Sequence, residues 1–245
     1  MTKTIILIPS RLNASRLPRK PLLKINNKSI IHHVYEKGHS TNIGEVYVAT
    51  GDMEIFQEVV NNNGKSILTK KDHLTGTDRI YEAYKKLNRN DIDYIINLQG
   101  DEPLIDTNDI VNLNNLAIKY NFEMATLACK LDTKNIENKN VVKVICEENI
   151  KQNKFSQAKK FLRTINNEKS ENIYHHIGIY IYKVTALQKF VSLKQSSNEI
   201  NLKLEQLRAL DNNIKIDVVF ANSIPVGVDT NEDFLEIKKL MEYKS

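Results

Sequence analysis

The sequence predicts an α/β fold in which helices cover both faces of a mostly parallel central sheet, a three-layer sandwich. Short apolar runs alternate with stretches that carry apolar residues at helical spacing, which is the pattern of parallel strands joined by crossover helices. The chain has 245 residues, of which 41% are hydrophobic and 27% charged, enough to bury a substantial core. Because no repeat, linker or break in composition is present, we predict a single domain over residues 1–245, with a less regular part at about 130–215.

Strands are predicted in the first half where a short apolar run ends at a turn or a polar loop. These runs are Thr4–Ile8, Val46–Thr50, Ile67–Leu68, Tyr94–Leu98 and Met124–Ala128. Helices are predicted between them, where apolar residues share one helical face. They are Ile30–Tyr35, Glu54–Val60, Ile80–Leu87 and Asp106–Tyr120. Gly64 is predicted to be the glycine just beyond the end of the second helix. Thr75 or Thr77 is predicted to be the N-cap of the third helix.

The second half is less regular. Its predicted strands are Val141–Cys146, Ile173–Tyr182 and Ile216–Phe220, and its predicted helix is Asn201–Leu210. A last helix is predicted to begin at Thr230, because Thr230 and Asp233 have the spacing of a capping box.

The composition excludes several classes of protein. Two cysteines, Cys129 and Cys146, are too few for a disulfide scaffold and fit a reducing cytoplasm. No apolar run approaches the roughly 20 residues that a membrane crossing requires, so we expect no membrane partner. The formal net charge of +5 is concentrated, since residues 1–37 hold eight basic side chains and one acidic one. A compact basic cluster favours a small polyanion over a long nucleic acid.

The first candidate site is the loop Pro9–Lys20, which follows the first predicted strand. Ligands of an open α/β sheet bind beyond the carboxyl ends of its strands. The loop holds four cations with hydroxyl groups at Ser10 and Ser15, a set that suits a polyphosphate. The cations are Arg11, Arg16, Arg19 and Lys20. A solvated basic loop is an equally good interpretation of this segment alone.

Three further loops carry candidate residues. Asp101, in Gln99–Pro103, is placed to ligate Mg²⁺, and Gly100 permits a close approach to the backbone, although an ordinary turn has the same composition. Asp229 is a possible second metal ligand or simply the residue before a helix. The loop Leu74–Arg79 offers hydroxyl and N–H groups to a base or ribose, or only a helix cap.

The histidines and one acidic residue have plain structural alternatives. His175 and His176 are adjacent on a predicted strand, so they face opposite sides and are poor candidates for one shared metal. Glu205 and Arg208 have the spacing of an ion pair on a helix surface.

The order of these motifs along the chain is more specific than any one of them. Ile-Pro-Ser-Arg begins at Ile8, Thr-Gly-Thr-Asp-Arg at Thr75, Gln-Gly-Asp-Glu-Pro at Gln99, His-x-Gly-Ile-Tyr at His176, Leu-Glu-Gln-Leu-Arg at Leu204 and Gly-Val-Asp-Thr at Gly227. With Ser-Arg-Leu-Pro-x-Lys-Pro-Leu from Ser15 and Val-Ala-Thr from Val48, this order resembles the 3-deoxy-manno-octulosonate (Kdo) cytidylyltransferase family over nearly the whole chain.

The resemblance implies a Rossmann-like, GT-A-like nucleotidyltransferase domain, a homodimer, that joins CTP and Kdo into CMP-Kdo and pyrophosphate for lipopolysaccharide biosynthesis, with Mg²⁺. It implies catalytic roles for Arg11 and Lys20 at the triphosphate and for Asp101 and Asp229 at the metal. The residues implied at the nucleotide are Pro9, Ser10, Arg11, Ser15, Arg16, Lys20, Thr75, Gly76, Thr77 and Gln99. Those implied at the sugar are Gln99, His176, Tyr180, Glu205 and Gln206.

The departures from the family pattern lie mainly on the acid-sugar side. Arg19 replaces a common glycine and either adds a phosphate contact or points outward. Gln157 and His175 each replace a common arginine, and the stretch before Tyr174 is shortened. Lys159, Lys160 and Arg163 are candidates to supply the lost positive charge. We therefore keep another acid sugar, sialate-like or 8-amino-Kdo, as the alternative acceptor.

Two more distant alternatives are a metal-dependent glycosyltransferase and an RNA-binding module. The first usually carries Asp-x-Asp after the strand, whereas this chain has Asp101 followed by Glu102. The second is disfavoured because aromatic residues do not alternate with the basic ones and Trp is absent.

Overall fold

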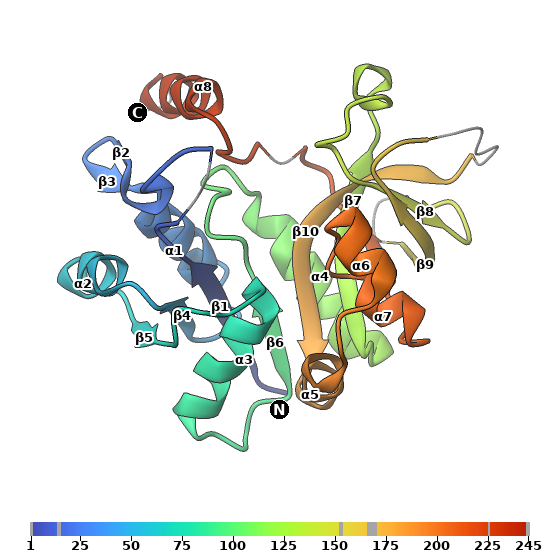
Figure 1. Ribbon diagram of the computed structural model, residues 1–245, viewed down its shortest axis with the longest axis horizontal. Coiled ribbons are helices and arrows are strands. Elements are labelled where there is room, and N and C mark those ends of the chain that lie inside the picture. Colours follow the sequence, from blue (N-terminus) through green and yellow to red (C-terminus); the bar gives the residue numbers. More distant parts are fainter. Residues whose placement is uncertain (1, 14–15, 152–153, 166–170, 225, 244–245) are drawn as a thin grey trace. The chain divides into compact units, whose positions relative to one another are not determined.

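The structure is a computed structural model that describes residues 2–13, 16–151, 154–165, 171–224 and 226–243. The chain divides into two compact units (Figure 1). Unit 1 comprises residues 1–108 and 225–245, and unit 2 comprises residues 109–224. Each unit is described by itself, and the single domain expected over 1–245 stays a prediction.

Unit 1 contains a parallel sheet whose strands match those predicted. The strands are β1 (Thr4–Ser10), β4 (Val46–Thr50), β5 (Ser66–Leu68) and β6 (Tyr94–Asn97). β1 lies between β4 and β6, and β5 pairs with β4 on the outside. Ile5–Ile8 of β1 are at most 2% exposed, because both faces of this central strand are covered.

Helices cover both faces of this sheet. They are α1 (Ile30–Ser40), α2 (Met53–Asn61) and α3 (Gly76–Leu87). α1 and α2 contact each other and carry the chain from β1 to β4 and then to β5, whereas α3 contacts β1 and leads back to β6 (Figure 1). Since parallel crossovers are right-handed, this reversal puts α3 on the opposite face. The three-layer arrangement is confirmed for unit 1.

Three small elements after the first loop were not predicted. They are the 3₁₀ turn η1 (Lys20–Leu22) and the two-residue strands β2 (Lys24–Ile25) and β3 (Lys28–Ser29). The turn between β2 and β3 has positive φ at both Asn26 and Asn27, the requirement of the tightest hairpins. Strands of two residues are too short to show a periodic pattern.

The left-handed residue just beyond the end of α2 is Asn63, not the predicted Gly64. Asn63 has φ 61°, and no glycine among the described residues has a positive φ. The amides of Asn63 and Gly64 donate to the carbonyls of Val60 and Val59 at 3.0 and 2.8 Å, which completes a Schellman motif. Asparagine tolerates the left-handed conformation, so the glycine was not needed at this position.

Unit 2 holds most of α4 (Thr107–Tyr120) and five strands whose pairings form a closed circuit. The strands are β7 (Met124–Lys130), β8 (Lys143–Cys146), β9 (Phe155–Leu162), β10 (Ile173–Lys183) and β11 (Asp217–Phe220). β10 pairs with β7 and β8, β9 with β8 and β11, and β11 with β7. Only the β7–β11 ladder is parallel. The expectation of a mostly parallel sheet therefore holds for unit 1 but not for unit 2.

The prediction of one helix over Asn201–Leu210 is wrong, because two short helices with a break between them lie there. α6 (Ser197–Leu202) ends at Lys203, which has φ 52°, and α7 (Leu207–Asp211) begins four residues later. Ser196 and Glu199 form a capping box that begins α6. The remaining elements, η2 (Thr133–Asn135), α5 (Val184–Ser192) and β9, were not predicted.

The last helix, α8 (Asn231–Glu242), returns to unit 1 and begins as predicted. The side chain of Thr230 accepts from the Asp233 amide, and that of Asp233 accepts from the Thr230 amide. Among the described residues, no helix combines the length and the apolar character that crossing a membrane requires.

Candidate active site

Unit 1 contains a pocket of about 550 Å³ at the carboxyl ends of its strands. Its walls come from the segments that follow β1, β5 and β6, from the start of α3 and from the segment before α8. They are Pro9, Ser10, Arg11, Asn13, Arg16, Lys20, Pro21, His73, Leu74, Thr75, Gly76, Arg79, Gln99, Gly100, Asp101 and Asp229. The volume lies in the range of pockets for small ligands. Three of the segments that the sheet-edge rule selects, those after β1, β5 and β6, thus line this pocket.

The pocket gathers nearly every residue predicted at the nucleotide and the metal. Ser15 lies outside the described residues. Thr77 does not line the pocket, since it is 1% exposed and its Oγ1 lies 3.4 Å from Nδ2 of Asn97. The sequence did not single out Asn13, Pro21, His73, Leu74 or Arg79. The group that lies close to the backbone of Gly100 is the carbonyl oxygen of Pro9. A Cβ atom added to Gly100 would lie 3.0 Å from this oxygen.

The loop after β1 is held in place by contacts at both of its ends. The amide of Leu12 donates to Oδ2 of Asp52 at 2.9 Å, and the amide of Arg19 to the carbonyl of Leu12 at 3.3 Å. Leu17 anchors the loop from below in an apolar cluster with Ile25, Ile30, Val228 and Ile237. A loop restrained in this way presents its cations to the pocket without having to fold around a ligand.

Arg19 points away from the pocket. Its guanidinium pairs with the carboxylate of Glu54 on α2, and it is absent from the pocket wall. Its φ of 58° explains why glycine suits this position, because glycine adopts the left-handed region without cost. Of the two interpretations of Arg19, the outward one is correct.

Asp101 and Asp229, which are 128 positions apart in sequence, meet at one ammonium group. The Lys20 Nζ atom lies 2.6 Å from Oδ2 of Asp101 and 3.3 Å from Oδ1 of Asp229. Nη2 of Arg16 lies 3.0 Å from Oδ2 of Asp229. A backbone bond from the Val228 amide to the Asp101 carbonyl, 2.9 Å long, brings the two segments together.

The Glu102 side chain lies beside these carboxylates and holds its proton to a higher pH than an ordinary glutamate. Burial, together with the charges of Asp101 and Asp229, raises the pKa of Glu102 to about 8. Its Oε2 atom is out of solvent and has no hydrogen-bond partner in the structure. Glu102 is therefore neutral at pH 7 and does not add a third negative charge.

The donor set fits a magnesium ion. The two carboxylates already converge on a cation, the Lys20 ammonium, and carboxylate oxygen is the ligand that Mg²⁺ prefers. Among the described residues, no group of three or more His, Cys, Asp or Glu side chains has the arrangement of a metal site. The two aspartates would thus hold the ion together with ligand oxygens and water, as is usual for Mg²⁺ at phosphates.

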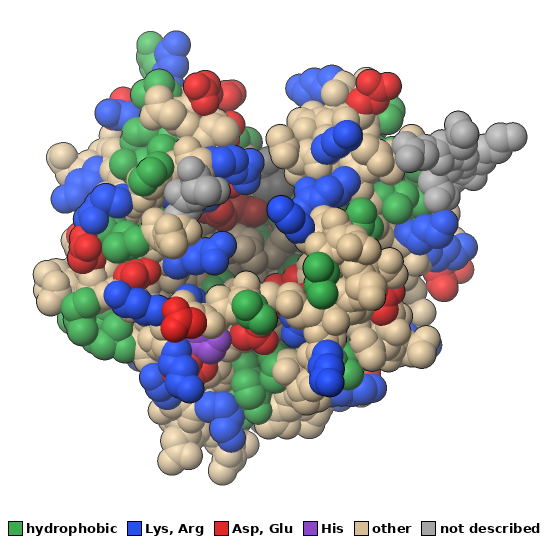
Figure 2. Space-filling view, viewed as in Figure 1, with side chains coloured by type: hydrophobic (Ala, Val, Ile, Leu, Met, Phe, Trp, Pro, Cys, Tyr) green, Lys and Arg blue, Asp and Glu red, His purple; other side chains and the backbone are tan. Residues whose placement is uncertain are grey.

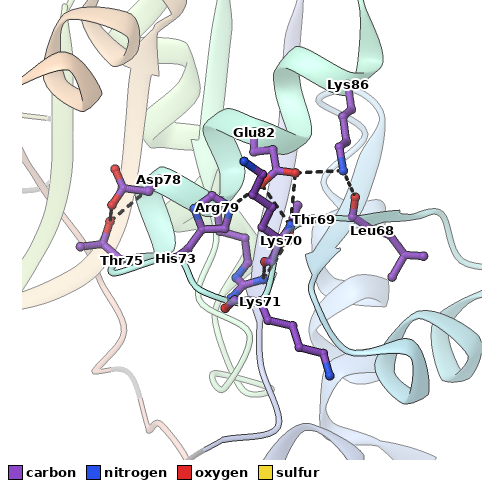
Figure 3. A network of polar contacts seen from close by, with 10 residues as sticks. All are labelled: Leu68, Thr69, Lys70, Lys71, His73, Thr75, Asp78, Arg79, Glu82 and Lys86. Carbon is purple, nitrogen blue, oxygen red and sulfur yellow. Dashed lines mark hydrogen bonds and ion pairs between the residues drawn. The ribbon is translucent and has the colours of Figure 1, made fainter.

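Arg79 fixes the wall of the pocket that follows β5 (Figure 3). It is 4% exposed, and its guanidinium donates to Oγ1 of Thr69 at 2.7 Å and to the carbonyls of Lys70 and Lys71 at 3.0 and 3.1 Å. Burial lowers the pKa of Arg79, an effect that the charge of Asp52 opposes.

Glu82 of α3 supports the same loop from the other side (Figure 3). It accepts from the amide of Lys70 and pairs with His73 and Lys86. Partial burial alone would raise its pKa, but the hydrogen bonds from Lys86, His73 and the Lys70 amide lower the pKa of Glu82 to about 2. His73, Leu74 and Thr75 are thereby held at the pocket wall.

We expect Arg79→Lys to impair nucleotide binding although it keeps the charge. A lysine ammonium lacks the planar fork that bonds three acceptors at once. The KM for the nucleotide should rise by about tenfold, as expected for the loss of one or two charge-assisted bonds. Steady-state kinetics measure this. The matched control is Arg89→Lys, at a half-buried arginine that is not on the pocket wall, and an equal KM change in both variants would contradict the role of Arg79.

Unit 2 brings together two of the residues expected at the sugar. Nε2 of His176 lies 3.1 Å from the hydroxyl of Tyr180 and 3.0 Å from Oγ1 of Thr126. The register of β10 against β7 shifts between Ile177 and Tyr180, and the carbonyls of Ile177 and Ile179 lie 3.0 and 2.8 Å from the Thr126 hydroxyl.

These two side chains are uncharged. Burial, helped by the neighbouring His175, lowers the pKa of His176 to about 3. Burial raises the pKa of Tyr180 well above its usual value, and the charges of Tyr182 and Glu205 act in the same direction. The pair can therefore exchange hydrogen bonds with a sugar hydroxyl, but it cannot supply a positive charge at neutral pH.

Glu205 and Gln206 lie where α7 begins. Gln206 is 6% exposed, and its Nε2 atom is buried without a hydrogen-bond partner in the structure. The expected location of Arg208 on a helix surface is wrong, because its side chain is buried. Arg208 instead donates to Glu199 through Nε at 2.9 Å and Nη2 at 2.6 Å, and both side chains are 3% exposed.

Arg163 is held by backbone carbonyls. Its guanidinium donates to the carbonyls of Leu202, Lys203 and Lys139, so it ties loops together. Lys143, which the sequence did not single out, is fully buried on β8. Its Nζ donates to the carbonyls of Asn138 and Arg163 at 2.6 and 3.0 Å, and burial lowers its pKa.

The Gln157 side chain lies on one face of the sheet, and the group formed by Thr126, His176 and Tyr180 lies on the other. Gln157 pairs in register with Asp217, whereas Ser156 pairs with Val218, the partner of Thr126. Burial raises the pKa of Asp217 to about 6, and Lys215 opposes this only in part. A role of Gln157 in acceptor choice stays a prediction.

We expect Asp217→Asn to raise stability at pH 8 and to have little effect at pH 4. The folded pKa of Asp217 lies above its usual value of about 3.9, so the folded state holds the proton more tightly. The wild type therefore loses stability as the pH rises from about 4 through about 6. Thermal melts at the two pH values measure this. The matched control is Asp211→Asn, and a gain of equal size at pH 4 would contradict the role of burial.

Comparisons with known proteins agree with the fold. Residues 5–216 match the family model described as "Cytidylyltransferase", a match that runs through both units. The 3-deoxy-manno-octulosonate cytidylyltransferase of Bartonella tribocorum is 40% identical over 239 residues, covering 97% of this chain and 98% of that protein. The protein of the same name from Thermodesulfovibrio yellowstonii is 41% identical over 251 residues, covering 97% and 98%.

Solved structures give the same result. A CMP:2-keto-3-deoxy-manno-octonic acid synthetase complexed with CTP superposes with a TM-score of 0.89 and 34% identity, covering 100% of both chains. A UDP-glucose pyrophosphorylase, with a TM-score of 0.69 and 12% identity over all of both chains, shares the fold. The α/β nucleotidyltransferase fold is confirmed, and it defines a nucleotidyl-transferring enzyme. Within that class, the chain belongs to the 3-deoxy-manno-octulosonate cytidylyltransferase family.

Proposed function

We propose that this chain transfers the cytidylyl group of CTP to the anomeric hydroxyl of Kdo, giving CMP-Kdo and pyrophosphate. The observation that carries the proposal is the pocket in which Arg11, Arg16 and Lys20 share one space with Asp101 and Asp229. The names of relatives about 40% identical over nearly their whole length support the same reaction. The related synthetase was solved with CTP bound.

The chemistry is an in-line displacement at the α-phosphorus. The anomeric oxygen forms the new P–O bond and its proton passes to water, while the bond from the α-phosphorus to the bridging oxygen breaks and pyrophosphate leaves. Arg11, Arg16 and Lys20 would bind the phosphate oxygens and stabilise the charge that develops on them. Pro9, Ser10, Thr75 and Gly76 line the part of the pocket assigned to the cytidine.

Asp101 and Asp229 would hold magnesium. When bound, the ion supplies Lewis-acid activation of the attacking hydroxyl and neutralises phosphate charge. The carboxylates that would hold it lie at the part of the pocket where Lys20 and Arg16 also reach. His176 is neutral and buried, so it is not assigned as the general base.

In unit 2, His176, Tyr180, Glu205 and Gln206 are proposed to contact the acid sugar. Their polar atoms are buried and suited to hydroxyl groups. Gln99, which lines the pocket of unit 1, is proposed to contact the nucleotide or the sugar. We further propose a role in lipopolysaccharide biosynthesis and a homodimeric state, both of which rest on the family resemblance, and a cytoplasmic location, which rests on the low number of cysteines. Size-exclusion chromatography with light scattering measures the oligomeric state.

A panel assay tests the proposed function. Purified full-length chain is incubated with Mg²⁺, each of CTP, UTP and ATP, and each of Kdo, 8-amino-Kdo and sialate, and pyrophosphate release is measured. The proposal expects release that depends on both CTP and Kdo. Release with sialate or 8-amino-Kdo in preference to Kdo would establish the alternative acceptor, and consumption of a sugar nucleotide instead of CTP would indicate a glycosyltransferase.

The face drawn in Figure 2 gives no support to an RNA-binding role. On the face drawn in Figure 2, Asp and Glu side chains lie among the Lys and Arg side chains. A polyanion that follows a long track needs a continuous basic surface.

We expect Lys20→Ala to impair CTP use far more than Kdo use. The variant removes a half-buried ammonium from the pocket wall and leaves unit 2 unchanged. kcat/KM for CTP should fall by at least about a hundredfold, as is typical when a phosphate-binding charge is lost. Steady-state kinetics with either substrate varied measure this. Lys24→Ala, at an exposed lysine, is the matched control, and a larger change in the KM for Kdo than for CTP would refute the assignment.

A further inference from the structure

Lys20 occupies the position where a metal ion would be held. Its Nζ atom contacts both carboxylates assigned to magnesium, at 2.6 and 3.3 Å, while Lys20 itself is assigned to the triphosphate. The Lys20 ammonium is therefore assigned both to the two carboxylates and to the triphosphate. The contact with the carboxylates is incompatible with a metal ion bound between them, because the ion would take the place of the ammonium.

The charges around the two aspartates balance without any ligand. Lys20 is 12% exposed, so its pairing with Asp101 is partly shielded from water, and Arg16 neutralises the second oxygen of Asp229. Two cations, Lys20 and Arg16, thus face the two carboxylates of Asp101 and Asp229. A divalent ion that entered alone would displace the ammonium or lie beside it, and either costs free energy.

Nucleotide binding changes this balance. The triphosphate brings negative charge into the same pocket, which is lined by Arg11, Arg16, Lys20 and Arg79. Lysine suits a transfer between partners, since its ammonium is a compact charge on a flexible four-carbon stem. The backbone at Lys20 need not move, because it begins the η1 turn and is followed by Pro21.

We infer that Lys20 is a removable counter-ion of Asp101 and Asp229, which keeps metal affinity low until a triphosphate draws the ammonium away. The inference rests on the proposed function for the identity of the triphosphate. If Lys20 acts in this way, bound nucleotide strengthens metal binding. Bound metal must then strengthen nucleotide binding by the same factor, because such coupling is reciprocal. Loss of Lys20 should therefore strengthen metal binding while it weakens nucleotide binding.

The test measures Mn²⁺ binding to the nucleotide-free full-length chain by electron paramagnetic resonance. Lys20→Met should tighten Mn²⁺ binding by about tenfold or more, within the usual range of coupling between sites. The control is Lys24→Met, which removes one positive charge from an exposed site and should change binding by less than about twofold because exposed charges are screened. Calorimetry in EDTA should show weaker CTP binding to Lys20→Met than to the wild type.

The outcomes separate the inference from the proposed function. Equal Mn²⁺ affinity in Lys20→Met and Lys24→Met would overturn the inference, as would a gain that persists in Lys20→Met/Asp101→Asn. If Lys20→Met lowers the melting temperature, Lys20→Gln is measured instead, with the same expected gain. If the Mn²⁺ pattern holds but the wild type releases no pyrophosphate from CTP, the counter-ion role stands and the proposed transfer reaction is wrong.

Discussion

Asp101→Asn is expected to lower turnover by about a hundredfold to ten-thousandfold, which corresponds to several kcal/mol of lost transition-state stabilisation. Asparagine keeps the shape of the side chain but loses the charge that would hold magnesium. The fold should persist, because the structural bond at this position is made by the backbone carbonyl of Asp101, which accepts from the Val228 amide. Turnover at saturating CTP and Kdo measures the effect.

A matched variant separates loss of the metal from loss of charge in general. Asp72→Asn removes an exposed carboxylate from the loop beside the pocket and should keep nearly full turnover. Mn²⁺ affinity is measured for both variants, and it should fall only in Asp101→Asn. A normal rate in Asp101→Asn would remove Asp101 from the reaction.

Arg208→Met is expected to destabilise the protein by about 3–5 kcal/mol, the usual cost of leaving one member of a buried ion pair alone. Both Arg208 and Glu199 are 3% exposed and are joined by two hydrogen bonds. The guanidinium also lies over the ring of Phe190, 4.7 Å from its centroid. Urea unfolding followed by circular dichroism measures the loss.

Two comparisons make the stability prediction specific. Glu199→Met/Arg208→Met should be less unstable than Arg208→Met, since it leaves no buried charge unpaired. Lys28→Met breaks an exposed ion pair with Glu36 and should cost less than about 1 kcal/mol. A loss below that figure in Arg208→Met would show that the Leu-Glu-Gln-Leu-Arg arginine is not the structural support of α6 and α7.

The sequence predicted unit 1 well because its signals are local. Each buried parallel strand there is a short apolar run that ends in a loop, and the sheet-edge rule then selects the loops that form the pocket. The pairing of Asp101 with Asp229 followed from the family resemblance. The link between Val228 and Asp101, which brings the two residues together, depends on the return of the chain to unit 1 and has no local signal.

Unit 2 was predicted less well because its contacts depend on register and on distant partners. The helix break at Lys203 lies in a stretch with continuous helical spacing, and the partner of Arg208 is Glu199, on the far side of that break. The contact of Gln157 with the Asp217 position exists only through the β9–β11 register. Arg79 lies in a candidate loop of the sequence but had no role of its own there, since arginines are mostly exposed and only the structure shows that this one is buried.

The measurement that tests the central claim most directly is ³¹P nuclear magnetic resonance of the complete reaction. With CTP, Kdo and Mg²⁺, the three signals of CTP should be replaced by one phosphodiester signal and one pyrophosphate signal, and only when Kdo is present. Unchanged CTP in the complete mixture, or release of free CMP and pyrophosphate without Kdo, would contradict transfer of the cytidylyl group to the anomeric oxygen.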